Sequence, residues 1–256
     1  MGGPRLTATE MQPWADAMYV ADSDPLRTGI RKFIYQAEPA TKENLRKLVA
    51  ASDLEQATPR TLSWLATVYM MVGDPAGSNR VSQRALRQHP DDLMLNFDYA
   101  LMLSMQQKHE QAIRYLMRCT AVRPQIPGVW KSLGEALRKN GELNESTEVL
   151  QHLIELEPDN VENHVELART LLAQNAYQAV LNHFEPLPIE WEKQIYAWRC
   201  MGLAYQGLQD WAQARESFET CDQLAKQQGL NLPTQEWLSD LATAEASAKS
   251  NDEEAK

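Results

Sequence analysis

A 34-residue periodicity limits the folds open to this chain more than any other feature of its sequence. It is clearest over residues 127–160, where two apolar helical faces flank a break at Asn140 and Gly141. Pro158 ends the second helix, because proline has no N–H and its ring clashes with the preceding turn. One hairpin of this size cannot bury its apolar face alone, so neighbouring hairpins must stack. The period therefore predicts an all-α solenoid of antiparallel helix pairs.

The same register holds over five consecutive units, which we expect at 59–92, 93–126, 127–160, 161–194 and 195–228. The eighth position of each unit is small and lets the two helices of a pair approach closely; its residues are Ala66, Ala100, Gly134, Ala168 and Gly202. The seventh position is large and fills the space beside it; its residues are Leu65, Tyr99, Leu133, Leu167 and Met201. In the fourth unit Pro186 and Pro188 predict an early end to the second helix.

These positions resemble the consensus of the tetratricopeptide repeat (TPR) family over residues 59–228. The third unit has Trp130, Leu133, Gly134 and Pro158 where that family has Trp, Leu, Gly and Pro. The last unit matches at Trp198, Gly202, Tyr205, Ala214 and Phe218. The resemblance implies a right-handed TPR-type α-solenoid with a concave groove lined by the first helix, helix A, of each pair. The first unit departs from the pattern, with Ser78 and Ser82 at two positions that are usually apolar.

The segments on either side of the repeats are less regular. We expect residues 1–13 to be a disordered leader and residues 14–58 to form divergent N-terminal helices, with the first around Trp14 and Met18 and the next starting at Asp24 and Pro25. Residues 229–249 are expected to form a C-terminal capping helix, because a solenoid needs a terminal element with one polar face. Residues 250–256 are polar and are expected to be a disordered tail.

Composition excludes several classes of function. The formal charge of −10 argues against nucleic-acid binding. No apolar run approaches the roughly 20 residues that a membrane span needs. Three cysteines lie far apart in the sequence, which indicates a reducing compartment and therefore a cytoplasmic location.

No catalytic or metal motif stands out in the sequence. The five histidines form no HExxH motif and no paired His/Cys cluster, and the carboxylates are expected on helix exteriors. We therefore expect no enzyme activity, no metal and no cofactor.

The TPR resemblance implies that positions 2, 5, 9, 12 and 13 of each helix A face the groove. In the first two units these positions give a methionine patch of Met70, Met71, Met94, Phe97, Leu101 and Met105. The third and fourth units give a basic strip of Lys131, Arg138, Lys139 and Arg169, followed by Tyr196 and Arg199 in the fifth. Methionine is common at adaptable binding surfaces, and exposed cations suit an acidic partner.

Each surface has a simpler interpretation. The helices at 14–58 could fold over the methionine patch, and neighbouring helices A could bury Phe97 and Leu101 between them. The basic strip could be neutralised by ordinary pairs such as Glu135 with Lys139.

The expected function is a non-catalytic scaffold or adaptor that binds a peptide or partner segment in the groove. Segments such as SDPLRTGIRKFI are also similar to the TPR tails of bacterial serine/threonine protein kinases, so the chain could instead be a regulatory or substrate-recruiting segment of a larger enzyme. A self-associating structural module is a third alternative. The sequence does not identify the partner.

Overall fold

The computed structural model describes residues 24–35, 41–185 and 194–254, and within these ranges all regular secondary structure is α-helical. The chain divides into two compact units, Met1–Pro124 and Gln125–Lys256. The expected helix around Trp14, the leader before it and the connection at 186–193 lie outside the described residues.

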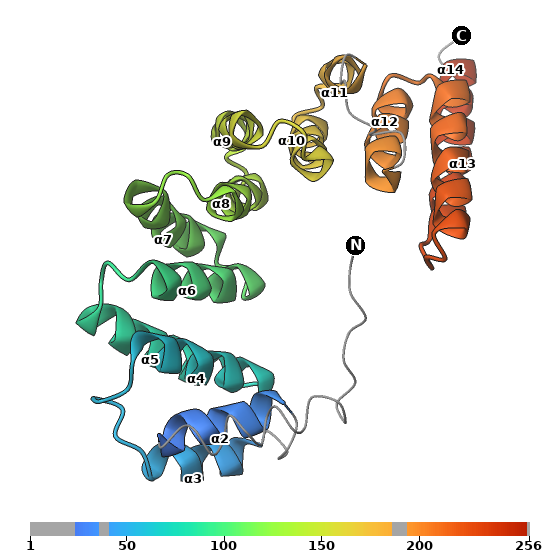
Figure 1. Ribbon diagram of the computed structural model, residues 1–256. Helices are drawn as coiled ribbons and strands as arrows, with labels where there is room; N and C mark the ends of the chain where they lie inside the picture. Colours follow the sequence, from blue (N-terminus) through green and yellow to red (C-terminus); the bar gives the residue numbers. More distant parts are fainter. Residues whose placement is uncertain (1–23, 36–40, 186–193, 255–256) are drawn as a thin grey trace. The chain divides into compact units, whose positions relative to one another are not determined.

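The first unit is a stack of helix pairs. Its helices are α2 (Pro25–Ile34), α3 (Lys42–Ala50), α4 (Pro59–Met71), α5 (Pro75–Gln88), α6 (Leu93–Met105) and α7 (His109–Val122). Helix α4 packs against α5, and α6 packs against α7, to form two hairpins. Helices α2, α4 and α6 follow one another in the stack, as Figure 1 shows. The A helices α4 and α6 are therefore direct neighbours.

The second unit repeats this arrangement. Its helices are α8 (Pro127–Asn140), α9 (Leu143–Leu156), α10 (Val161–Ala173), α11 (Tyr177–Phe184), α12 (Ile195–Gly207), α13 (Trp211–Gln227) and α14 (Thr234–Glu254). Helix α10 contacts both α8 and α12, so the A helices again stack on one another. Helix α11 has only eight residues and ends at Phe184, before the prolines that predicted its early end.

Small residues allow the helices of a pair to approach closely. A Cβ atom on Gly134 would lie 2.6 Å from Cγ of Leu150, a side chain of α9 that is almost fully buried. A Cβ on Gly202 would lie 2.9 Å from the ring of Phe218 on α13. Ala168 at the same repeat position is fully buried. The small eighth residue thus makes room for the large side chain that faces it.

The turn inside each of the five hairpins has the same backbone conformation. Position 15 of the unit, one or two residues after the end of helix A, has a positive φ in each hairpin; these residues are Gly73, Gln107, Gly141, Asn175 and Gln209. The amide of the next residue then donates to a carbonyl five residues back, as in the 2.9 Å bond from Lys108 N to Leu103 O. This left-handed cap satisfies carbonyls at the end of helix A.

Capping side chains mark the start of three helices A, α4, α6 and α10, whereas α8 and α12 have no side-chain cap. Asp92 accepts a hydrogen bond from the amide of Leu95 at 2.9 Å at the start of α6, and Thr58 accepts one from the amide of Thr61 at the start of α4. Asn160 does the same for α10. These bonds satisfy amides that have no partner within the helix.

Helix α14 closes the second unit. It packs on α13 and buries Leu241, with Trp237 beside it. The helix continues to Glu254, so residues 250–254 are helical where the sequence suggested a disordered tail. This stretch contains no glycine or proline to stop the helix, and Lys249 pairs with Glu245 one turn earlier.

Candidate interaction groove

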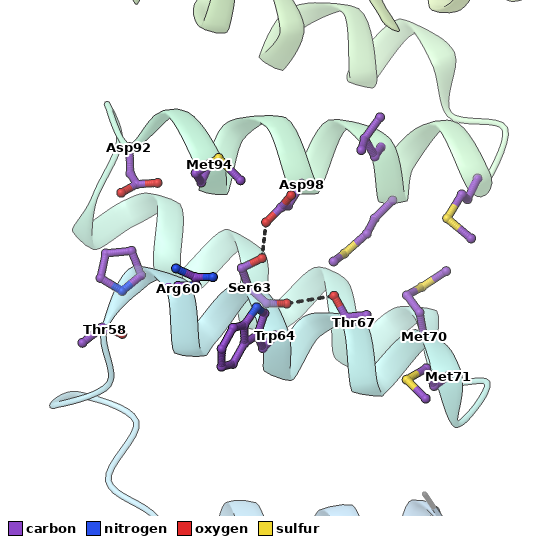
Figure 2. Close-up of a pocket in the computed structure, with 14 residues that line it drawn as sticks. Thr58, Arg60, Ser63, Trp64, Thr67, Met70, Met71, Asp92, Met94 and Asp98 are labelled. Carbon is purple, nitrogen blue, oxygen red and sulfur yellow. Dashed lines mark hydrogen bonds between the residues drawn. The ribbon is translucent and has the colours of Figure 1, made fainter. Parts of the chain in front are cut away.

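A groove of about 910 Å³ runs between the A helices α4 and α6 of the first unit (Figure 2). Its lining is mostly apolar; the residues are Thr58, Pro59, Arg60, Ser63, Trp64, Thr67, Met70, Met71, Asp92, Met94, Asp98, Leu101, Met102 and Met105. This volume is in the range of sites that bind ligands or side chains of a partner. Apart from Thr58, which caps α4, no residue before α4 lines the groove, so the described parts of α2 and α3 leave it open.

The groove surface consists of one stripe from each helix. Arg60, Trp64, Thr67 and Met71 are spaced by four, three and four residues, and Met94, Asp98, Leu101 and Met105 repeat this spacing 34 residues later. This spacing places each set on a single helical face.

Several apolar side chains on this face remain in contact with solvent. Met105 is 74% exposed, Met94 58% and Leu101 38%. An exposed cluster of large apolar groups is unusual on a soluble surface unless the surface makes a contact.

The groove includes five of the six residues of the methionine patch. Met70, Met71, Met94, Leu101 and Met105 all line it. Phe97 is half-buried and does not line it. Trp64 and Asp98, at position 6 of their units, line the groove and were not among the expected residues. The i, i+4, i+7 spacing from Arg60 and Met94 was the signal that could have identified them.

Two polar features break the apolar lining. The Ser63 hydroxyl donates a hydrogen bond to Oδ2 of Asp98, which links α4 to α6 across the groove. The Arg60 guanidinium carbon lies 5.0 Å from the centre of the Trp64 ring, within cation–π distance. Figure 2 shows Arg60, Asp92 and Met94 at one end of the groove and Met70 and Met71 at the other.

The basic strip lies in the second unit, and each of its four cations has an acidic neighbour. Lys131 Nζ is 2.9 Å from a carboxylate oxygen of Glu162, and Lys139 Nζ is 2.7 Å from Glu135. Burial acts to raise the pKa of Glu135, but the hydrogen bond from Lys139 and the charges around it outweigh this effect and lower the pKa. The strip is therefore largely neutralised by its own chain.

The two arginines of the strip share one carboxylate, Glu166. Arg169 lies 2.5 Å and Arg138 3.6 Å from its two oxygens. The Glu166 side chain is only 8% exposed, so the expectation that carboxylates lie on helix exteriors is wrong at this position. Glu166 and Arg169 lie on α10, and Arg138 lies on α8, which packs against α10.

The last two expected residues have different surroundings. Tyr196 and Arg169 line a second hollow of about 780 Å³ in the second unit, and the Arg169 guanidinium lies 5.3 Å from the Tyr196 ring centre. Arg199 is half-buried, and its guanidinium lies 4.6 Å from the ring centre of Trp237 on α14. Arg199 thus packs against the closing helix.

One pair of histidines was not expected from the sequence. Nδ1 of His164 lies 3.0 Å from Nε2 of His183, and Nε2 of His164 lies 2.7 Å from the Pro158 carbonyl oxygen. Burial, with the charge of His164, lowers the pKa of His183 to about 4. Among the described residues no group of three or more His, Cys, Asp or Glu side chains is arranged to hold a metal ion.

The three cysteines are buried thiols. Burial raises the pKa of Cys119 to about 11, and those of Cys200 and Cys221 to about 12. They are therefore protonated at neutral pH and lack the thiolate needed for nucleophilic attack. Across the described helices, none is both long and apolar enough to cross a membrane.

Helix pairs with small residues at the eighth position, left-handed turns and stacked A helices define an all-α solenoid of the TPR type. The family model described as "Tetratricopeptide repeat" matches residues 128–160. The chain thus resembles tetratricopeptide-repeat proteins in the sequence of this stretch and in its fold. The further resemblance to kinase tails is not confirmed by these comparisons.

Solved structures share the fold at low sequence identity. The C-terminal part of a TPR repeat-containing protein from Cytophaga hutchinsonii is 16% identical, with a TM-score of 0.57 over 90% of this chain and 94% of that one. A crystal structure of MamA protein is 18% identical, with a TM-score of 0.55 over 68% and 97%. A MamA structure from Desulfovibrio magneticus RS-1 is 16% identical, with a TM-score of 0.51 over 70% and 92%. No curated protein sequence matches the chain.

Proposed function

We propose that this chain is a non-catalytic interaction module that binds an apolar segment of a partner protein in the groove between α4 and α6. The main support for this proposal is the cluster of Met94, Leu101 and Met105, which line the groove and are exposed to solvent. TPR solenoids generally serve as interaction scaffolds, and their stacked repeats create extended binding surfaces. A preformed groove also avoids much of the ordering cost of binding.

The dimensions of the groove suit a short helix or an extended peptide. Helix α6 has 13 residues, so the groove beside it is about 20 Å long. A partner helix of three to four turns would place its apolar stripe over the methionines. Flexible methionine side chains can adjust to different apolar shapes, which favours a partner defined by its pattern of apolar residues.

The proposal is tested by selecting a library of random peptides of about 16 residues, a length that spans the groove as a helix, on the immobilised full chain. The selected pool is then bound to a Leu101→Ala/Met105→Ser variant. Loss of the apolar contacts should weaken binding by about tenfold or more, because each buried side chain contributes about 1–3 kcal/mol.

The matched control is Met117→Ser/Val122→Ala on α7. These side chains are also exposed, at 57% and 48%, in the same unit but outside the groove. The control should bind the pool as the wild type does, and circular dichroism should show both variants folded. A pool that binds the groove variant and the control equally well would rule out this groove as the site.

A further inference from the structure

The groove contains a carboxylate that no cation among the described residues neutralises. Asp98 projects from α6 toward α4 and is half-buried. Ser63 donates to its Oδ2, whereas Oδ1 accepts no hydrogen bond from the described residues. Across the same residues, no lysine, arginine or histidine lies within ion-pair distance of Asp98. Its negative charge is therefore available at the surface of the groove.

The other charges near the groove have local roles. Asp92 accepts the amide hydrogen bond that caps α6, and its charge is favourable at the positive end of that helix. Arg60 lies over the Trp64 ring at the end of the groove. Asp98 differs from both. It lies between Met94 and Leu101 on the apolar stripe, and within the described part of the chain its one hydrogen-bond donor is a neutral hydroxyl.

An occupant of the groove would have to compensate this charge. A partner that covered the methionines would also remove water from Asp98, and a desolvated carboxylate without a cation is strongly unfavourable. A lysine or arginine placed opposite Asp98 would remove this penalty and add a charge-assisted hydrogen bond to Oδ1. An acidic residue at that point would repel it.

We propose that the segment bound in this groove is amphipathic and basic, with a lysine or arginine within its apolar stripe that pairs with Asp98. This inference rests on the proposed function and specifies the chemistry of the partner. The charge of the chain favours a different protein over a second copy, because a molecule with a formal charge of −10 repels its own kind. Apolar contacts would provide most of the affinity, and Asp98 would provide the selectivity.

To test this inference, peptide pools are selected on the wild type, on Asp98→Asn and on Asp91→Asn, and the selected peptides are sequenced. Asparagine keeps the acceptor for Ser63 but removes the charge, and Asp91 is an exposed aspartate outside the groove. The wild-type and Asp91→Asn pools should be enriched in lysine and arginine next to apolar residues. The Asp98→Asn pool should keep its apolar residues and lose the basic ones, and wild-type peptides should bind Asp98→Asn about tenfold more weakly.

The outcomes separate this inference from the proposed function. Apolar pools without a basic preference, or a preference that survives Asp98→Asn, would overturn the role of Asp98 while leaving the groove as a binding site. A failure to enrich any apolar peptide would overturn both.

Two other occupants would give their own results. Competition by a synthetic peptide of residues 1–23 would assign the groove to the chain's own N-terminal segment. A dimer in sedimentation that Leu101→Ala/Met105→Ser abolishes would assign it to a second copy. Either result would contradict the proposal that a partner protein occupies the groove.

Discussion

At the scale of single residues, we expect Glu166 to contribute more to stability than its position beside the basic strip suggests. It is buried, and it is the shared partner of two arginines from α8 and α10. Glu162 lies one turn earlier on α10 and pairs with Lys131, but its side chain is well exposed. Burial thus separates two ion pairs that look alike in the sequence. Solvent screens an exposed pair, whereas loss of one partner of a buried pair leaves an uncompensated charge.

We therefore expect different costs for the same substitution at these two glutamates. Glu166→Gln leaves Arg138 and Arg169 without their shared countercharge and should lower the free energy of unfolding by about 2–4 kcal/mol. Glu162→Gln should change it by less than about 1 kcal/mol. Urea denaturation at neutral pH measures both variants, and equal losses would mean that Glu166 is not a structural ion pair.

At the scale of the elements, the repeated turn after each helix A is the most regular part of the backbone. Position 15 has a positive φ in all five hairpins, yet its residue is Gly in two, Asn in one and Gln in two. This conformation costs a residue with a Cβ about 1 kcal/mol, and the cost is smaller for Asn than for Gln. The two glutamine turns therefore contain strain that the glycine turns lack.

Replacing one of these glutamines should stabilise the protein. Gln107→Gly relieves the left-handed conformation at φ 60° and should raise the free energy of unfolding by about 0.5–1 kcal/mol. The control is Gln106→Gly, one residue earlier, where φ is −85° and glycine offers no relief. That change should destabilise the protein, and chemical denaturation compares the two. A loss of stability in Gln107→Gly would contradict the strain argument.

The all-α solenoid fold was predictable from the sequence, because a 34-residue period leaves stacked hairpins as the solution that buries every apolar face. The division into five TPR units stays a prediction, since the family match covers residues 128–160. The groove was less predictable. Each residue turns a helix by about 100°, so Phe97 and Asp98 face different directions, and only the packing of α4 against α6 decides which one lines the groove.

At the scale of the whole molecule, the candidate groove lies entirely within one of the two compact units. The groove-lining residues fall between Thr58 and Met105, and the first unit extends to Pro124. Each unit has its own buried residues, such as Leu103 and Leu116 in the first and Leu150 and Phe218 in the second. In repeat proteins, stability is approximately a sum of local terms. Damage to the second unit should therefore leave the groove folded.

Gly134→Ala tests this separation of the two units. Its new methyl group would overlap Leu150, and overpacking costs about 1–3 kcal/mol, which outweighs the helix propensity of alanine. Hydrogen exchange should show faster exchange in α8 and α9, with unchanged protection in α4 and α6 and unchanged peptide binding. Gly128→Ala is the control, because its Cβ would contact nothing within 4 Å and exchange should not accelerate. If protection fell equally in α4 and α8, the two units would unfold as one cooperative body, and the groove would depend on the whole solenoid.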